Sequence, residues 1–256
     1  MLKRTIFLII IITIFIQSSL SLLLGYEFKV GETLTYNIYA AGLKVGYQII
    51  EVKGIKNING RKVIELKGHS KSAPFVSLLY RLNDKWRILV DAESLKPIRI
   101  EKDMVEGKKS GFIIYEIDQE NLKVIMTDVT NNRVKEIKAK NPVFDFISMV
   151  YKFRRDAALY SDIGKRITFD FLEPEKTRTV SFINVGESLI PNPISSKNKR
   201  NRTVRTIVYK QTKKPWIIFY VDSNEGHLPL KMEVEAKLAN ALKIQIEVEL
   251  KKYKPH

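Results

Sequence analysis

Hydrophobic and polar residues alternate along most of the chain from Leu34 onward. Leu34, Tyr36 and Ile38 share one side of this pattern, and the residues between them are polar. Because successive side chains of a strand point to opposite faces, the alternation predicts strands with one buried and one solvated face. Further strands are predicted over residues 45–55, 63–72, 86–90, 98–105, 109–117, 122–128, 134–139, 167–171, 179–185, 203–210, 216–221, 230–237 and 242–251.

The breaks between these strands are mostly short. Asn59-Gly60 is a strong hairpin signal, because both residue types tolerate a positive φ angle. Pro74 ends one strand, and residues 75–80 are expected to form a short helical or bent connector. Residues 186–202 are expected to be the longest segment without a strand.

One segment has the period of a helix instead. Ile147 and Val150 belong to a series of hydrophobic residues spaced by three or four positions between residues 144 and 160. Asp145 near the start and Gly164 after the end are typical of helix boundaries. About a dozen strands and this one central helix predict a mainly β fold, either a strongly curved antiparallel sheet or an open β-barrel, since flat sheets of that many strands are rare.

The first residues have the order of a secretory signal. Two basic residues precede an apolar run, which a short polar stretch follows. Ser19 and Ser21 are small residues of the kind that signal peptidase prefers before a cut, so residues 1–21 are predicted to be a signal peptide. Residues 26–254 are then predicted to form a single β-rich domain of an exported protein, in the periplasm or cell envelope.

An uncleaved membrane anchor is the alternative for this segment. The leucines at positions 20 and 22–24 extend the apolar character toward the roughly 20 residues that span a bilayer. The polar residues Gln17, Ser18 and Ser19 interrupt the run and favour cleavage. After Gly25 no segment of the sequence is long and apolar enough to predict a membrane-spanning helix.

The composition narrows the chemistry that such a domain can perform. The chain contains no cysteine, which excludes disulfides, thiolate catalysis and zinc–thiolate sites. Of its three histidines, His256 is the last residue, so a histidine-rich metal site is not expected. We therefore expect neither a metal nor another cofactor. The 44 basic and 28 acidic residues give a formal charge of +16, which attracts phosphates on nucleic acid or on anionic lipids.

Several short motifs follow one another along the chain, namely Gly31-Glu32 with Leu34 and Tyr36, Gly42 to Gly46, Tyr80 with Asp84, Val90-Asp91, Leu95-Lys96-Pro97, the helical Asp145, Ser148, Tyr151, Phe153 and Arg154, Val221-Asp222, and Leu228-Pro229-Leu230. In this order they resemble the motifs of the family called Domain of Unknown Function 3108. The resemblance covers nearly all of the chain after the predicted leader. It implies an exported bacterial envelope protein with a curved antiparallel sheet, and it brings no established activity.

Motifs of catalysis are missing from the sequence. It contains neither a Gly-x-Ser-x-Gly nucleophile motif nor a phosphate-binding glycine-rich loop. His69 lies next to a serine, which we interpret as an ordinary strand histidine. Glu101 with Asp103, and Glu233 with Glu235, are spaced by two, which is typical of the solvated face of a strand. We therefore expect no catalytic residue and no enzymatic activity.

Residues 222–227 allow two interpretations. Asp222, Asn224 and Glu225 have a spacing of oxygen ligands that resembles a calcium loop. The stretch also has the composition of a hairpin turn before His227, which explains it without a metal.

Aromatic residues within the predicted strands are the candidates for ligand contact. Their default role is core packing, but in a sheet that curls without closing they would line a hydrophobic groove. The predicted groove residues are Tyr36, Phe112, Tyr115, Phe169, Phe171, Trp216 and Phe219.

A basic cluster is the most concentrated charge feature. Lys199, Arg200, Arg202 and Arg205 are predicted to contact anionic lipid headgroups or a membrane surface. Export would separate the chain from nucleic acid, so no nucleic-acid partner is expected. A solvated loop that only blocks aggregation is the alternative.

These patterns give three hypotheses for the function. The first is an exported, non-catalytic protein that binds a lipid or another hydrophobic molecule in its curved sheet. The second is a structural or scaffolding envelope protein that acts through protein contacts. The third is an enzyme acting on sugars or phosphoesters. The sequence leaves the oligomeric state open.

Overall fold

The computed structural model describes residues 28–157, 162–194, 203–214, 216–224, 226–237 and 243–255. In these residues 15 strands form one sheet, in the order β8-β7-β6-β5-β4-β3-β2-β1-β15-β14-β13-β12-β11-β10-β9. The strands are β1 (Thr33–Ala40), β2 (Leu43–Ile58), β3 (Arg61–Ser72), β4 (Asn83–Asp91), β5 (Pro97–Glu106), β6 (Lys109–Asp118), β7 (Lys123–Asp128), β8 (Arg133–Lys138), β9 (Val143–Phe144), β10 (Arg166–Glu173), β11 (Lys176–Pro191), β12 (Thr203–Gln211), β13 (Ile217–Asp222), β14 (Pro229–Lys237) and β15 (Lys243–Lys254). Two helices, α2 (Pro74–Ser77) and α3 (Phe146–Asp156), accompany the sheet.

The first and last strands meet in the middle of the sheet. β1 pairs with β2 on one side and with β15 on the other, both antiparallel. The first half of the chain therefore extends the sheet in one direction and the second half extends it in the other. β9 is parallel to β10, and the other neighbours in the described chain are antiparallel.

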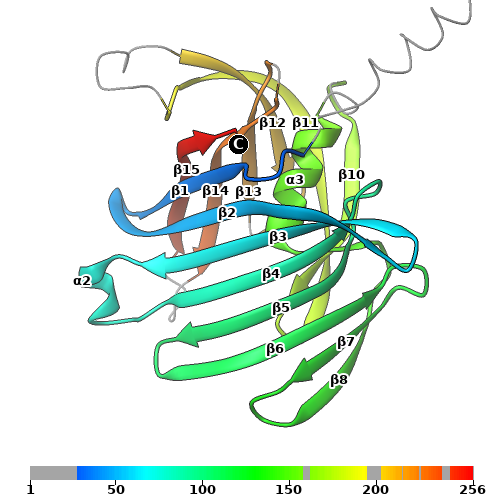
Figure 1. Cartoon of the computed structure of the whole chain (residues 1–256). Helices are drawn as coiled ribbons and strands as arrows, with labels where there is room; N and C mark the ends of the chain where they lie inside the picture. Colours follow the sequence, from blue (N-terminus) through cyan, green and yellow to red (C-terminus); the bar gives the residue numbers. More distant parts are fainter. Residues whose placement is uncertain are drawn as a thin grey trace, which may run out of the picture.

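The sheet curls around α3 until its edges approach one another (Figure 1). Near the β10–β11 hairpin, Tyr115 donates a hydrogen bond to the carbonyl O of Pro174 at 3.0 Å, and Thr177 donates to that of Lys138 at 3.1 Å. Lys135 pairs with Glu175 at 3.2 Å across the same seam. Side-chain contacts, rather than backbone pairing between strands, join the two edges of the sheet. The barrel is therefore open. The predicted mainly β fold with a curved sheet and one central helix is confirmed, with 15 strands in place of about a dozen.

The start of α3 is set by a buried cap. The Asp145 carboxylate accepts from the backbone N–H of Ile147 at 2.8 Å and of Ser148 at 3.3 Å, and Ser148 accepts from the Asp145 backbone in return. This capping box satisfies backbone donors that a helix start leaves free. Burial raises the pKa of Asp145.

The bounds predicted for this helix need a correction at the start. Val143 and Phe144 form β9 beside β10, so the helix begins at Phe146 rather than at residue 144. A backbone that pairs with a strand is extended and cannot be helical at the same residues. The last predicted helical residues, 158–160, lie outside the described residues.

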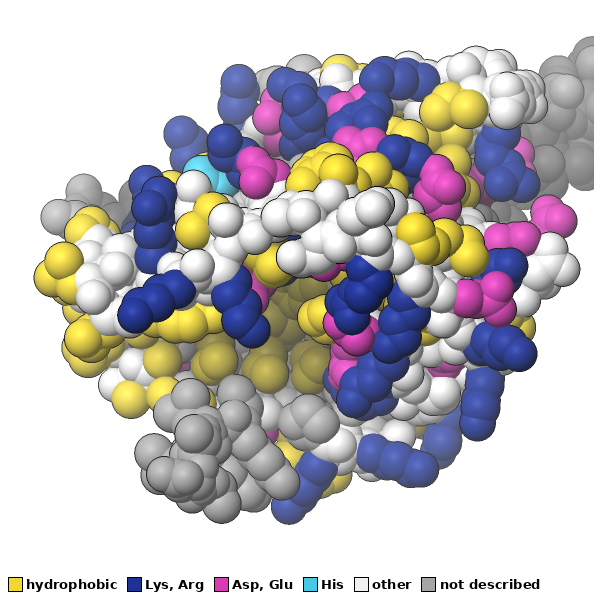
Figure 2. Space-filling model, turned by 90° about the horizontal axis from the view of Figure 1, so that it is seen from below, with side chains coloured by type: hydrophobic (Ala, Val, Ile, Leu, Met, Phe, Trp, Pro, Cys, Tyr) yellow, Lys and Arg dark blue, Asp and Glu magenta, His cyan; other side chains and the backbone are white. Residues whose placement is uncertain are grey.

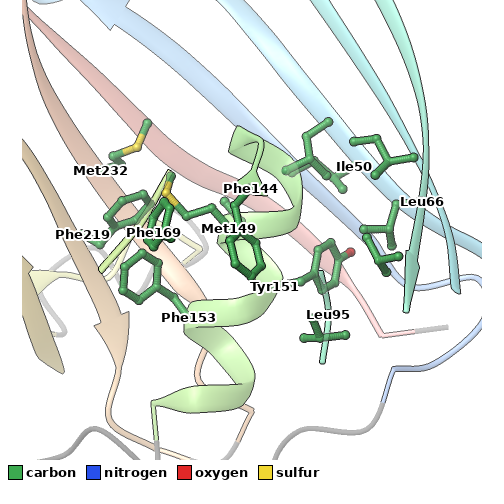
Figure 3. Close-up of a cluster of buried hydrophobic side chains, with 14 of the residues drawn as sticks. Ile50, Leu66, Leu95, Phe144, Met149, Tyr151, Phe153, Phe169, Phe219 and Met232 are labelled. Atoms are coloured by element: carbon green, nitrogen blue, oxygen red, sulfur yellow. The ribbon is translucent and has the colours of Figure 1, made fainter. Parts of the chain in front are cut away.

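Aromatic rings form the core on one side of α3 (Figure 3). The Phe153 ring centroid lies 4.9 Å from that of Phe219, 5.2 Å from that of Phe182 and 5.1 Å from that of Tyr209. Each fully buried ring of this kind contributes roughly 1.5–3 kcal/mol. The helix is thereby fixed to β11, β12 and β13.

A buried ion pair fixes the C-terminal end of α3. Arg154 Nη1 donates to Glu32 Oε1 at 2.6 Å and Nη2 donates to Oε2 at 3.3 Å, with both side chains 0% exposed. The carbonyl O of Gly226 accepts from Arg154, and Tyr253 donates to Glu32 at 3.3 Å. A buried charge without its partner is strongly destabilising, so this pair ties the helix to the segment ahead of β1 and to the β13–β14 turn.

The region predicted to lack strands is shorter than expected. β11 continues through Gly186 to Pro191, where the sequence pattern ends the strand at residue 185. The backbone N–H of Gly186, at φ 106°, donates to Asn184 Oδ1 at 2.8 Å within a bulge. A bulge shifts the alternation by one residue, and this hides the continuation of the strand. Neither helix in the described chain has the length and hydropathy needed to cross a membrane.

Candidate ligand-binding site

The helix occupies one end of the curled sheet and leaves the other end open. Seen from that open end, the molecule is hollowed, with hydrophobic side chains in the depth and Lys and Arg around the rim (Figure 2). This space is called the hollow below. Its wall consists of inward-facing, half-buried hydrophobic side chains, namely Ile38, Trp86, Ile113, Phe146, Phe171, Ile217, Val234 and Ile246.

Two rows of paired residues form facing walls of the hollow. Ile217, Val234 and Ile246 lie directly opposite one another on β13, β14 and β15. On the other wall, Trp86 pairs with Lys102, and Lys102 pairs with Ile113, across β4, β5 and β6. The row on β13, β14 and β15 is therefore hydrophobic, whereas the row on β4, β5 and β6 contains a lysine.

A glycine lets the helix approach the polar wall. Gly68 on β3 pairs with Trp86, and a Cβ atom at Gly68 would lie 2.5 Å from Ile147 Cδ1. A side chain at this position would require the end of the Ile147 side chain to move away. The first turn of α3 therefore closes the depth of the hollow directly beside Trp86.

The polar wall contains a buried lysine between two carboxylates. Lys102, 9% exposed, lies 2.7 Å from Asp84 and 2.6 Å from Glu106, and its ammonium is 4.6 Å from the Trp86 ring centroid. Burial raises the pKa of Asp84 despite its bond to Lys102. For Glu106 burial acts in the same direction, but the bond and charge of Lys102 outweigh it and hold the pKa below its usual range. The positive charge of Lys102 is therefore balanced by two carboxylates within the wall.

The indole N–H of Trp86 has no such compensation. Its Nε1 atom is buried and meets no hydrogen-bond acceptor among the described residues. A buried donor without an acceptor costs about 1–3 kcal/mol. An acceptor on a bound molecule would remove this cost once the indole turned toward it, so Trp86 is a candidate polar contact of the hollow, as is the equally unpartnered hydroxyl of Tyr36.

The predicted groove residues divide between the two faces of the sheet. Tyr36, Phe169 and Phe219 are inward and buried in the core, and Tyr36 and Phe219 line a cavity of only about 10 Å³ together with Phe146 of α3. Phe171 lies at the hollow, and Tyr115 is buried at the seam.

Two of the predicted groove residues lie on the outer face. Phe112 is directly opposite the outward-facing Asp103 and is 36% exposed. Trp216 lies against the ammonium of the exposed Lys210, 5.0 Å from the ring centroid. Alternation fixes which residues share a face, but not which face is inside.

The predicted basic cluster is only partly described. Arg205 on β12 is 67% exposed, lies 3.6 Å from Glu187 and pairs with Leu189 of β11. Lys199, Arg200 and Arg202 lie outside the described residues.

The outer face contains a depression of 420 Å³ over β2 to β6. His69, Glu101 and Asp103 line it, so the structure brings these three together. The His69 ring nitrogen is 2.7 Å from Asn83 Oδ1. Burial acts to raise the pKa of Glu101, but hydrogen bonds from Arg99 and Arg87 outweigh it and hold the pKa below its usual range. Glu101 is thus held as a carboxylate within an ion-pair network.

The remaining candidates for chemistry lie elsewhere. His227 is in the β13–β14 turn, where its Nδ1 is 3.0 Å from the carbonyl O of Asp222. Asn224 donates to Asp222 within the same turn, as a hairpin of this composition would. Glu233 pairs with Lys231 at 3.1 Å.

Sequence reasoning missed Trp86, Lys102, Asp84 and Glu106 as a group. The signal available was Lys102 itself, which takes an inward position between Ile100 and Met104 of β5. A charged residue in a hydrophobic register indicates a buried partner. The identity of that partner depends on pairing between strands, which the pattern of one strand does not contain.

Comparison with one solved structure supports a barrel-like fold. A beta-barrel-like protein of the domain of unknown function DUF1849 from Brucella abortus is 9% identical, with a TM-score of 0.56, covering 89% of this chain and 98% of that one. A "putative exported protein" with a YmcC-like fold from Bacteroides fragilis is 11% identical, with a TM-score of 0.35, covering 90% and 99%. A "putative lipoprotein" from Parabacteroides distasonis is 10% identical, with a TM-score of 0.36, covering 90% and 98%.

Sequence comparison gives the family. The search of curated proteins found no match. The family model described as a protein of unknown function, DUF3108, matches residues 35–247, which span β1 to β15 and include both walls of the hollow. The chain therefore belongs to the DUF3108 family, as the order of its motifs indicates.

Proposed function

We propose that this protein binds a lipid-like amphiphile in the hollow and performs no reaction on it. The observation that carries the proposal is the buried Trp86 N–H without an acceptor, set in the wall of a hydrophobic hollow. Burying the hydrocarbon part of a ligand there would contribute about 0.8 kcal/mol for each CH₂ group. An acceptor on the ligand would satisfy the indole.

The charges in the wall favour a neutral polar group on the ligand. Lys102 is shared by Asp84 and Glu106, so the three side chains have one more carboxylate than ammonium. A second anion beside them would be repelled. An ester or amide carbonyl, or a hydroxyl, fits Trp86 better than a free carboxylate.

The proposed place of action is the cell envelope. Residues 1–21 have the order of a secretory signal and lie outside the described residues. An exported protein meets membrane lipids as its most abundant hydrophobic molecules. Cell fractionation followed by N-terminal sequencing tests export, and a protein recovered with the cytosol would contradict it.

Tryptophan fluorescence provides a direct test of binding. The chain has two tryptophans, so Trp216→Phe leaves Trp86 as the single reporter in the hollow. A monoacylglycerol should shift its emission saturably, at roughly tenfold lower concentration than the fatty acid of equal chain length, because the carboxylate is repelled. The matched variant Trp86→Phe, which reports from Trp216, should show no saturable change.

Extraction of the purified protein completes this test. Protein isolated from its native envelope should yield a neutral or ester-linked lipid by mass spectrometry. An empty extract together with a silent Trp86 reporter would refute the proposal. Crosslinking in cells to one defined envelope protein would then favour the scaffolding function.

The absence of turnover is part of the same proposal. His69, Glu101 and Asp103 share the outer depression and are the residues to test for chemistry. Replacing each with Ala should change no activity in a broad screen with sugar and phosphoester substrates. Turnover by the wild type that any of these variants loses would overturn the non-catalytic reading.

A further inference from the structure

One end of the molecule exposes large hydrophobic side chains beside the hollow. Leu78 is 87% exposed and Leu79 is 92% exposed, directly after α2. Phe75 and Tyr80 in the same segment are 55% and 52% exposed. α2 lies at the left of the molecule in both overall views, next to the mouth of the hollow (Figures 1 and 2). A monomer in water gains nothing from holding four such side chains outward together.

This segment is held in place rather than loosely attached. The backbone N–H of Ala73 donates to the carbonyl O of Val45 at 2.8 Å, which joins α2 to the start of β2. On the other side, the N–H of Gly107 donates to the carbonyl O of Arg81 at 2.7 Å, which joins it to the β5–β6 turn. Leu43, 63% exposed, adds a further hydrophobic side chain on the β1–β2 turn. The α2 segment, the β1–β2 turn with the start of β2, and the β5–β6 turn are together called the tip below.

Basic side chains surround the hydrophobic ones on the tip. They are exposed and take part in no ion pair among the described residues, and they are Lys44, Lys71, Arg81, Lys108 and Lys109. The nearest acids, the buried Asp84 and the partly exposed Glu106, are both bound to Lys102. The tip therefore combines a hydrophobic centre with a positive border.

We propose that the tip docks onto an anionic phospholipid bilayer. Leu78 and Leu79 would enter the boundary between headgroups and acyl chains, and the basic border would lie among the lipid phosphates. In this orientation the mouth of the hollow faces the bilayer. The docking proposal rests on the hydrophobic and basic side chains of the tip. It therefore does not depend on whether the hollow binds a ligand.

Charge complementarity selects the bilayer over a second copy of the chain. Two tips that met face to face would bring five unpaired cations of each copy together, and like charges across an interface are unfavourable. An anionic lipid surface instead attracts each basic side chain, by about fivefold in affinity for each Lys or Arg. The same border makes docking sensitive to salt.

Vesicle flotation of the full-length exported protein tests this docking. The wild type should bind phosphatidylglycerol vesicles, bind phosphatidylcholine vesicles at least tenfold more weakly, and lose binding as salt is raised. Leu78→Glu combined with Leu79→Glu should weaken binding to phosphatidylglycerol roughly 100-fold, since each leucine transferred from water contributes about tenfold or more. Any retained leader is common to all variants and cancels in the comparison.

A matched variant supplies the control. Ile163→Glu with Leu189→Glu removes two hydrophobic side chains that are 76% and 65% exposed, with the same change in charge, away from the tip. This variant should bind vesicles within about threefold of the wild type. Equal binding by the Leu78/Leu79 variant and the wild type, or no binding of the wild type to anionic vesicles, would overturn the proposal.

The same variants separate docking from ligand binding and from self-association. In vesicle-free solution, the Leu78/Leu79 variant built on Trp216→Phe should keep the response of Trp86 to a monoacylglycerol. If Trp86 is silent in the parent Trp216→Phe protein while the wild type binds anionic vesicles and the Leu78/Leu79 variant does not, the result counts against ligand binding alone. If the wild type dimerises through the tip and does not bind vesicles, the tip is an interface with a second copy of the chain and not a bilayer-docking surface.

Discussion

The two ends of the barrel interior differ in how the inner face of the sheet is kept from water. Around the later turns of α3, Phe153, Phe182 and Phe219 pack ring against ring, and Arg154 is sealed with Glu32. At the other end the inner face remains half buried around the hollow. A helix of 11 residues is about 16 Å long, whereas strands of 10 residues extend about 33 Å, so α3 cannot fill the barrel that encloses it.

One end of the interior is tightly packed, whereas the other leaves the inner face of the sheet accessible. Substitutions at the filled end should lower the free energy of unfolding strongly, because the removed atoms leave cavities or unpaired charges. Substitutions in the wall of the hollow should cost little, because the side chains there already touch open space. Measurements of unfolding by urea can establish or refute this division.

The largest effect is expected at the buried ion pair. Arg154→Ala leaves Glu32 buried without a partner and should lower the free energy of unfolding by about 3–5 kcal/mol. Arg205→Ala, which removes an exposed arginine, should change it by less than about 0.5 kcal/mol. If both substitutions lower the free energy of unfolding in urea by similarly small amounts, the Arg154–Glu32 pair is not shielded from water.

A double variant separates the effect of the buried charge from the effect of lost packing. Glu32→Leu with Arg154→Met removes both charges and keeps the volume, so it should be more stable than Arg154→Ala alone. If the double variant is as unstable as the single one, lost packing rather than the buried charge explains the effect.

The next effect contrasts the two ends with one kind of change. Phe153→Ala should cost about 3–5 kcal/mol, because three other rings surround the position. Ile246→Ala in the wall of the hollow should cost under about 1.5 kcal/mol, since that side chain is half buried and leaves no closed cavity. Similar costs by urea unfolding would mean that the interior is uniformly packed.

A smaller effect is expected where the helix meets the wall. Gly68→Ala would bring a methyl group within 2.5 Å of Ile147 Cδ1 and should cost about 1–3 kcal/mol. Adding Ile147→Ala should recover part of this loss, measured as non-additivity in a double-mutant cycle. Full additivity would indicate that the helix already sits farther from β3.

The smallest effect is a dependence on pH at the anchor that leads into α3. Asp170 accepts from the Lys140 N–H at 2.7 Å, from Asn141 at 2.9 Å and from Thr179 at 2.7 Å. Burial acts to raise its pKa, but these hydrogen bonds outweigh it and the pKa lies below the usual range. The stabilisation is therefore present above the unfolded pKa and is lost as the pH falls through the folded pKa.

Asp170→Asn measures this contribution. The variant should be less stable than the wild type by on the order of 1 kcal/mol at pH 6, and this difference should narrow as the pH falls below about 4, the ordinary pKa of an aspartate. Thermal unfolding across this range provides the comparison. Parallel pH curves for both proteins would show that Asp170 does not titrate with folding.

Local signals in the sequence predicted the elements well. The alternation around Leu34 predicted β1, Asn59-Gly60 predicted the β2–β3 turn, and Asp145 marked the start of the helix within one residue. Each of these depends on residues close together in the chain. The prediction failed at Gly186, because a bulge changes the period without changing the strand.

The sequence pattern did not show on which face of the sheet the candidate groove residues lie. Phe112 and Trp216 have the residue types of a ligand groove but lie on the outer face, whereas Trp86 lies in the wall of the hollow. In the sequence, an aromatic residue within an alternating pattern looks the same whether its side chain lies on the inner or the outer face of a curled sheet. Only the direction of curling separates them.

The sequence by itself determined which segments are strands, which one is a helix, and which residues share a face, because these follow from φ/ψ preferences and from periods of two and 3.6 residues. The tertiary structure decided that β1 pairs with β15, that the sheet curls around α3, and that this short helix leaves one end of the interior open. These outcomes depend on contacts between residues far apart in the chain, and such contacts have no local period.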